Sequence, residues 1–366
     1  MRLVHTTLLV TMFLGALSGC GAQPAAEEGQ LPAFSSISNG LVNRPANPRC
    51  IAPTSTQVPQ MLSRLNCFDS IDPALPGPSM VPYDVVASLW ADDADKARWF
   101  AVPDGATISV DQTGRLLLPR GSMLFKTFAL AGQRLETRVW MNHSDTGWSG
   151  YSYRWDPGAV DAVLAGQEDE HVAVAGSSET WTIPGRGQCA RCHVNHENPN
   201  LGFQLAQLDR DFTYPTTGRS ANQLGTLRAI GLLELPIEPT AGAQLVDYRD
   251  EAQPLAARAR SYLHANCSSC HYDATGYCTG DLRITAPDKA MGLCNVASRQ
   301  IDPLWGWHED TRLIAPGDPQ RSALWLRLSA PGGASMAMPP LGRHEVDQAG
   351  VELIAAWISA MPGCPN

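Results

Sequence analysis

Two five-residue motifs in the chain combine a pair of cysteines with a histidine. Residues 189–193 read CARCH, and residues 267–271 read CSSCH. Two thiols separated by two residues, with an imidazole directly after the second thiol, form the attachment motif of covalent c-type haem. The thiols would add to the vinyl groups of haem, and the imidazole would bind the iron on its proximal side. We therefore predict two c-type haems, attached through Cys189, Cys192, Cys267 and Cys270, with His193 and His271 as proximal iron ligands.

Zinc is the main alternative ligand of paired cysteines. Zinc-binding pairs usually lie about 12 to 20 residues apart, whereas Cys192 and Cys267 are much further apart in the chain. Zinc also has no need of a histidine after each pair. A thioredoxin-like dithiol would need one C-x-x-C in a βαβ context, which the surrounding sequence does not provide. Both motifs therefore fit haem better than zinc or a redox dithiol.

The second motif is followed by a methionine-proline segment and a helical pattern. Residues 255–266 predict a helix that runs directly into CSSCH, and Met338 precedes two prolines. Near the C-terminus, apolar residues at helical spacing predict one buried helix face. These are Val351, Ile354, Trp357 and Met361. This order of elements resembles the class I cytochrome c fold.

That resemblance implies that Met338 is the distal ligand of the second iron, opposite His271. Met336, two residues earlier, is the alternative ligand, and both methionines could instead be apolar filler. Ligation by histidine and methionine closes both axial positions of the iron and raises its potential, which suits electron transfer.

The distal ligand of the first haem is not specified by the sequence. A helix is predicted around residues 219–235 by the spacing of its apolar residues, but no Met-Pro pair appears before the second motif. His196 lies too close to His193 in the chain to reach the opposite face of the same iron. An open distal position is one alternative. The other candidates are Met141, His143, His264, Met291, His308 and His344.

The N-terminus has the features of an export signal. Arg2 is followed by an apolar run over residues 8–17, which is too short to span a bilayer as a mature helix. Residues 17–20 read LSGC and resemble the bacterial lipobox, which implies a signal peptide over residues 1–19 and lipidation of Cys20. We expect an acylated protein anchored to a membrane of the cell envelope, on the periplasmic side or at the outer membrane, without a transmembrane span.

The remaining segments before the motifs are a tether and a β-rich region. Residues 20–45 are rich in Gly, Pro, Ala and Ser, which favours a flexible tether. Residues 46–185 contain short runs of alternating apolar and polar residues broken by turn residues, which predict an antiparallel β domain of sandwich type. Three acidic residues, Asp92, Asp93 and Asp95, lack the fuller ligand set of a calcium site, so a solvated acidic loop is expected there.

Five further cysteines remain in a chain that we expect in an oxidising compartment. Sequence proximity suggests the disulfides Cys50–Cys67 and Cys278–Cys294, which would leave Cys364 unpaired. Spacing alone does not fix the connectivity.

Several segments together resemble a family of exported bacterial dihaem c-type cytochromes. They include LWADDADKARWFAVPDG, LPRGSMLFKTFAL, WSGYSYRW, CARCH, LGFQLAQLDRDF and ARARSYLHANCSSCH. Residues 91–94 read ADDA where the family usually has SDGA, which leaves the role of that loop open. The resemblance implies an α+β multidomain protein: a β domain, a first haem-binding segment at residues 186–245, and a cytochrome c-like domain at residues 246–366.

Two classes of function are compatible with these features. The first is a non-catalytic electron carrier between redox protein partners of the cell envelope. The second is a dihaem oxidoreductase, such as a peroxidase, with an open first haem; the β-rich half argues against a close match to dihaem peroxidases. The β domain could also dock the cytochrome to a partner or a glycan. The net charge of −9 argues against nucleic acid as a partner.

Overall fold

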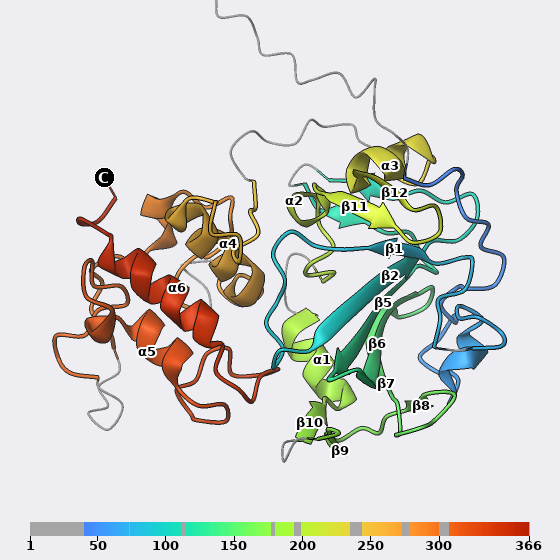
Figure 1. Cartoon of the computed structure of the whole chain (residues 1–366), viewed down its shortest axis with the longest axis horizontal. Coiled ribbons are helices and arrows are strands. Elements are labelled where there is room, and N and C mark those ends of the chain that lie inside the picture. Colours follow the sequence, from blue (N-terminus) through green and yellow to red (C-terminus); the bar gives the residue numbers. More distant parts are fainter. Residues whose placement is uncertain are drawn as a thin grey trace, which may run out of the picture. The chain divides into compact units, whose positions relative to one another are not determined.

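A six-stranded antiparallel sheet organises the N-terminal half of the chain (Figure 1). Its strand order is β1-β2-β5-β6-β7-β8, and every neighbouring pair is antiparallel. The strands are β1 (Val81–Tyr83), β2 (Asp95–Ala101), β5 (Met123–Leu130), β6 (Gln133–His143), β7 (Gly147–Arg154) and β8 (Val163–Leu164). This arrangement confirms the predicted antiparallel β region.

The structure is a computed structural model. It describes residues 40–72, 74–111, 114–176, 180–193, 199–234, 244–272, 278–299 and 307–365. The predicted signal peptide, Cys20, most of the predicted tether and His196 lie outside these residues. From Ile37 onwards the chain forms one compact unit.

Alternating side chains give the large sheet two different faces. Phe125, Val139, Met141 and Tyr151 lie on one face and belong to a buried cluster that also contains the 3-10 helix η1 (Leu62–Leu65). This face is therefore the apolar interior of the β region. The opposite face carries Phe100, Leu124 and Trp140 at one end, within a second buried cluster.

Short elements complete this opposite side of the β region. They are β3 (Ser109–Val110), β4 (Leu116–Leu117), β9 (Glu170–Ala173), β10 (Thr180–Ile183), α2 (Leu205–Leu208), β11 (Asp211–Tyr214), β12 (Arg219–Asn222) and α3 (Gln223–Ala229). Within the described ranges the additional sheets are two-stranded ribbons, so the second layer is not a large facing sheet of the kind that a sandwich would have. The helix predicted over residues 219–235 is only partly correct: its apolar face is buried, but residues 219–222 form β12 and α3 ends at Ala229. Gly231 follows with a φ of 70°.

Helices dominate the C-terminal part. The longer ones are α4 (Leu255–Cys267), α5 (Ala323–Ser329) and α6 (Gln348–Ser359), with short 3-10 turns at η2 (Asp288–Met291) and η4 (Pro319–Arg321). Figure 1 shows α4, α5 and α6 gathered together, and α6 contacts both other helices. The predicted helix before CSSCH is confirmed. The predicted buried face of the last helix is confirmed for Val351, Ile354 and Trp357, whereas Met361 lies beyond the end of α6 and is half-buried.

The crossing of α4 and α6 depends on a glycine. A Cβ atom at Gly350 would lie 2.3 Å from the Tyr262 hydroxyl, so no larger residue fits there unless the Tyr262 ring or the helices shift. The helix α6 begins at a cap in which the Asp347 carboxylate accepts the Gly350 N–H at 2.9 Å.

Two disulfides are present, and only one of them matches the prediction. Cys50–Cys67 is confirmed, whereas the predicted Cys278–Cys294 bond is wrong. Cys294 instead pairs with Cys364, and Cys278 is a free thiol. The last helix returns the end of the chain to the loop that contains Cys294, and this long-range contact cannot be inferred from spacing. In the part of the chain that the structure describes, no helix is long and apolar enough to span a membrane.

Candidate functional site

The first Cys-x-x-Cys-His motif forms the end of helix α1 (Arg186–His193), which packs on strand β7. The contact is close because Gly150 has no side chain. A Cβ atom at Gly150 would lie 2.8 Å from the Cys189 Cβ and 3.1 Å from its Sγ. Cys189 is therefore held against the sheet, on the face that carries Trp140.

The imidazole of His193 has a defined tautomer. Its Nδ1 lies 2.6 Å from the Pro199 carbonyl oxygen, which can only accept a hydrogen bond, so Nδ1 carries the proton. Nε2 then has the lone pair that a metal ion needs. The ring also lies over Trp140, with ring centroids 4.3 Å apart. These contacts orient the first predicted proximal ligand.

The second motif begins where α4 ends. The His271 N–H donates to the Cys267 carbonyl at 2.9 Å, so the motif forms a turn that continues the helix. His271 Nδ1 donates to the Thr279 carbonyl at 2.7 Å, as His193 does to Pro199. Burial lowers the pKa of His271, which favours the neutral, ligating form. Both motif histidines thus present the same nitrogen for metal binding.

The four motif cysteines are thiols without disulfide partners. Burial, followed by the neighbouring Cys270, raises the pKa of Cys267 to about 12. Burial also raises the pKa of Cys189. A redox dithiol needs a lowered thiol pKa, so the environment does not favour thioredoxin-like chemistry.

The two motifs are neighbours in space. Burial raises the pKa of Cys192, and the next largest cause is the electrostatic influence of Cys270 in the other motif. Near the motifs, the His264 Nε2 of α4 lies 2.8 Å from the side-chain amide of Gln204, which precedes α2. The structure therefore brings together two motifs that are distant in sequence.

The two methionines of the Met-Pro segment have different environments. Met336 is buried in a small cluster with Trp307 and Ala337, whereas Met338 is half-buried and outside that cluster. Arg327 of α5 holds the segment: its Nε donates to the Met336 carbonyl at 3.0 Å, and its own carbonyl accepts the Met338 N–H at 3.1 Å. Because Met336 is packed in this cluster, Met338 is the methionine that is better placed to act as an iron ligand.

Arg327 also connects this segment to the second motif. Burial is the main cause that lowers the pKa of His271, and the charge of the Arg327 guanidinium contributes in the same direction. One side chain thus lies close to His271 while it fixes the backbone around Met338.

Two candidate distal ligands of the first haem lie in the interior of the β region. Met141 is completely buried in the core on the face opposite Trp140. His143 has both ring nitrogens occupied, with Nδ1 2.7 Å from the Pro53 carbonyl and Nε2 2.8 Å from the Tyr151 hydroxyl. Neither side chain is available to an iron bound at α1.

Two further candidates are used in packing near the second motif. His264 is buried, and its Nδ1 accepts the Ile284 N–H at 3.1 Å while Nε2 contacts Gln204. Burial, assisted by Arg260 and Arg283, lowers the pKa of His264 to about 4, so the ring stays neutral. Met291 is buried in the core around α4 and α6. Both positions have a structural role.

The last two candidates are placed by backbone hydrogen bonds. The His308 N–H donates to the Thr311 hydroxyl at 2.9 Å. The exposed His344 donates its N–H to the Asp92 carboxylate at 2.8 Å, and the Glu345 N–H donates to the same oxygen at 2.9 Å. No contact of either imidazole with the first motif is present among the described residues.

The acidic loop at residues 92–95 is therefore more than a solvated turn. Asp92 and Asp93 have positive φ angles of 47° and 58°, and Asp92 receives two backbone N–H groups from the C-terminal part. The residues just before this loop make similar contacts. The Trp90 N–H donates to the Asn266 side-chain oxygen at 2.7 Å, and the Tyr248 hydroxyl donates to the Ser88 carbonyl at 2.8 Å. Sequence analysis missed this connection because it joins residues far apart in the chain.

A group of cations beside α1 was also missed. Arg98, Lys126 and Arg138 lie directly opposite one another on β2, β5 and β6. Each of the three residues lies in a different strand. They could have been grouped from the sequence only if the pairing and register of β2, β5 and β6 had been known.

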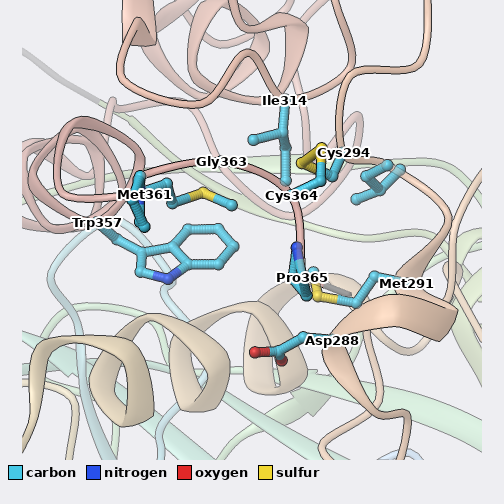
Figure 2. A pocket seen from close by; sticks show the side chains of 11 residues that line it. Asp288, Met291, Cys294, Ile314, Trp357, Met361, Gly363, Cys364 and Pro365 are labelled. Carbon is cyan, nitrogen blue, oxygen red and sulfur yellow. A yellow bond between two sulfur atoms is a disulfide. The ribbon is translucent and has the colours of Figure 1, made fainter.

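A separate cavity of 490 Å³ lies beside the Cys294–Cys364 disulfide (Figure 2). Its lining is mainly apolar and includes Met291, Trp357 and Met361. No residue of either Cys-x-x-Cys-His motif lines this cavity, so it is distinct from the candidate site.

No group of three or more metal-ligating side chains is gathered within the ranges that the structure describes. Comparison of the chain with protein-family models, curated proteins and solved structures finds no match.

Proposed function

We propose that the chain is a dihaem c-type cytochrome that transfers electrons between redox proteins of the cell envelope. The observation that carries this proposal is the shared arrangement of two adjacent Cys-x-x-Cys-His motifs. In each motif the histidine donates Nδ1–H to a backbone carbonyl and presents Nε2. Such a second partner is what orients metal-ligating histidines in proteins.

The residues present fit haem in three respects. Each motif offers two thiols without a disulfide partner, each offers an imidazole oriented by a hydrogen bond from Nδ1, and a half-buried methionine lies on the segment held by Arg327. When bound, a haem supplies an iron that exchanges one electron. The protein's part is to hold the imidazoles in place, to limit the access of water to the half-buried motif cysteines, and to supply Met338 to the second iron.

The proposal also assigns a fold, a family and a membrane tether to the chain. The helices α4, α5 and α6 would form a class I cytochrome c-like domain, and the whole chain would belong to the exported dihaem family described above. Lipidation at Cys20 would tether it to a membrane. Adjacency of the two motifs favours electron transfer from one haem to the other.

A peroxidase-like oxidoreductase is the second candidate. It is favoured by one observation: Met141, His143, His264 and Met291 are all engaged in packing or hydrogen bonds elsewhere, so four of the six candidate distal ligands of the first haem are unavailable. An iron without a distal protein ligand could bind a small substrate such as peroxide.

The deciding experiment is an absorption spectrum of the purified, haem-loaded protein, with and without carbon monoxide or peroxide. Mass spectrometry of the intact protein first counts the attached haems, and we expect two. We expect two low-spin haems that do not react with added ligands. One high-spin haem that binds them would replace the carrier with the oxidoreductase, and a protein without covalent haem would end both proposals.

A further inference from the structure

Three cations form a row across the face of the sheet that carries α1. Arg98 on β2 lies directly opposite Lys126 on β5, which lies directly opposite Arg138 on β6. Directly opposed residues of an antiparallel pair project to the same side, where like charges destabilise the sheet. Two such pairs in succession are stabilised by anions nearby.

The protein carboxylates around this row already have partners. The Glu136 carboxylate accepts hydrogen bonds from Arg138 at 2.7 and 3.0 Å and from the Trp181 indole at 3.0 Å. Asp84 accepts Arg98 at 2.6 Å and Arg210 at 3.2 Å. Both carboxylates are therefore committed to arginines.

Lys126, in the middle of the row, has no hydrogen bond or ion pair with any residue that the structure describes. Its ammonium lies 5.9 Å from the centre of the Phe128 ring. Burial lowers the pKa of Lys126 to about 7, and Arg98, Arg138 and Lys96 act in the same direction against Glu136 alone. An anion beside Lys126 would reverse this unfavourable balance.

A neutral donor next to the row is also unsatisfied. Trp140 follows Arg138 by two residues on β6, so both side chains lie on the same face. The Trp140 indole N–H is buried and has no hydrogen-bond partner among the described residues. A buried donor without a partner is costly, and its partner would have to be an acceptor that reaches this face.

Two of these donors, Trp140 and Arg138, lie near the first Cys-x-x-Cys-His motif. The Trp140 ring lies 4.3 Å from that of His193, and Cys189 packs at Gly150 beside it. Burial raises the pKa of the Cys189 and Cys192 thiols, and the charge of Arg138 acts on both in the opposite direction. Arg138 is thus near the positions at which haem would be attached.

We propose that Lys126, together with Arg98, Arg138 and the Trp140 indole N–H, binds the propionate carboxylates of the first haem. This inference rests on the proposed function. A haem attached through its vinyl groups keeps two propionates, which are ionised near neutral pH. Charge-assisted hydrogen bonds from lysine and arginine would neutralise them, and the indole N–H would donate a further, neutral hydrogen bond. Lys126 supplies the positive charge that no protein carboxylate compensates.

The test compares the haem-loaded proteins Lys126→Gln and Lys289→Gln. Lys289 is exposed on η2, so its substitution removes the same charge away from the sheet. Removal of Lys126 leaves a carboxylate uncompensated, which stabilises the ferric state of the first haem. We expect its reduction equilibrium to shift about tenfold toward ferric, a fall of about 59 mV in potential for one electron. The Lys289→Gln and Lys126→Arg proteins should keep the wild-type potential.

The outcomes separate this proposal from the proposed function. A wild-type protein that carries no covalent haem would contradict the proposed function. Two attached haems with unchanged potentials in Lys126→Gln would refute the propionate site alone. A change of the first haem from low-spin to high-spin in that variant would also overturn it, because Lys126 would then ligate the iron. If Lys126→Gln does not load haem, the potential of the Trp140→Phe protein, which lacks the indole donor, is expected to fall in the same direction, and no fall would refute the site.

Discussion

Gly150 and Cys189 are in direct contact, although one lies in a strand and the other in a helix that follows more than 30 residues later. The contact sets how closely the first haem motif approaches the sheet. It also places Cys189 next to Trp140, which contacts His193.

A methyl group at this position should disturb attachment of the first haem. In Gly150→Ala the new Cβ would lie 2.8 Å from the Cys189 Cβ, and such overpacking typically costs about 1–3 kcal/mol. We expect a mixture of one-haem and two-haem protein by intact mass. Gly187→Ala, on α1 itself and with open space around its Cβ, is the control. If Gly150→Ala carries two haems as completely as the wild-type protein, α1 tolerates the extra methyl group, and the close contact is not needed for haem attachment.

Met338 and Met336 should differ in their effects. Met338→Ala is expected to open the second iron to carbon monoxide and to lower its potential. Met336→Ala should leave the spectrum unchanged and reduce the free energy of unfolding by about 2–5 kcal/mol, because Met336 is buried. Spectra with carbon monoxide and chemical denaturation distinguish the two. If the Met336→Ala protein binds carbon monoxide and the Met338→Ala protein does not, Met336 is the ligand instead of Met338.

His264 should make the protein less stable in mild acid. Its pKa is lowered from 6.5 to about 4 in the folded state, so the unfolded state takes up the proton first as the pH falls. Stability from this group is fully present above pH 6.5 and is lost progressively toward pH 4, by roughly 3 kcal/mol at most. Denaturant titrations at several pH values measure the slope. His264→Gln should flatten it, and an identical slope in both proteins would contradict the role of His264.

The Cys294–Cys364 disulfide should contribute more stability than Cys50–Cys67. The two bonds span 70 and 17 residues, for which loop-closure entropy predicts about 4 and about 3 kcal/mol. Cys364→Ser is therefore expected to lower the unfolding midpoint more than Cys50→Ser. Peptide mapping without reduction should find Cys278 alkylated, whereas a Cys278–Cys294 peptide would contradict this connectivity.

Local patterns in the sequence predicted those elements that local residues determine. The helix before CSSCH and the face of Val351, Ile354 and Trp357 follow from one helical period. Register across strands does not follow from such patterns, so the row of Arg98, Lys126 and Arg138 was not foreseen.

Alternation along a strand also explains why one predicted ligand was unsuitable. Trp140 and Met141 are consecutive in β6 and therefore lie on opposite faces of the sheet. Trp140 faces the first motif, and Met141 enters the core behind it. Alternation along β6 shows that the two side chains point to opposite faces, but only the position of α1 decides which face lies against the first Cys-x-x-Cys-His motif.

The segment from Ser88 to Asp92 has a consequence for kinetics. Its contacts with Tyr248, Asn266 and His344 join the β region to three separate parts of the helical region. Electron tunnelling between redox centres slows steeply with their separation, whereas the potential of each centre depends on its own surroundings. If the chain carries the two haems proposed above, a change in this turn would therefore alter how fast they exchange an electron while leaving the driving force of the exchange the same.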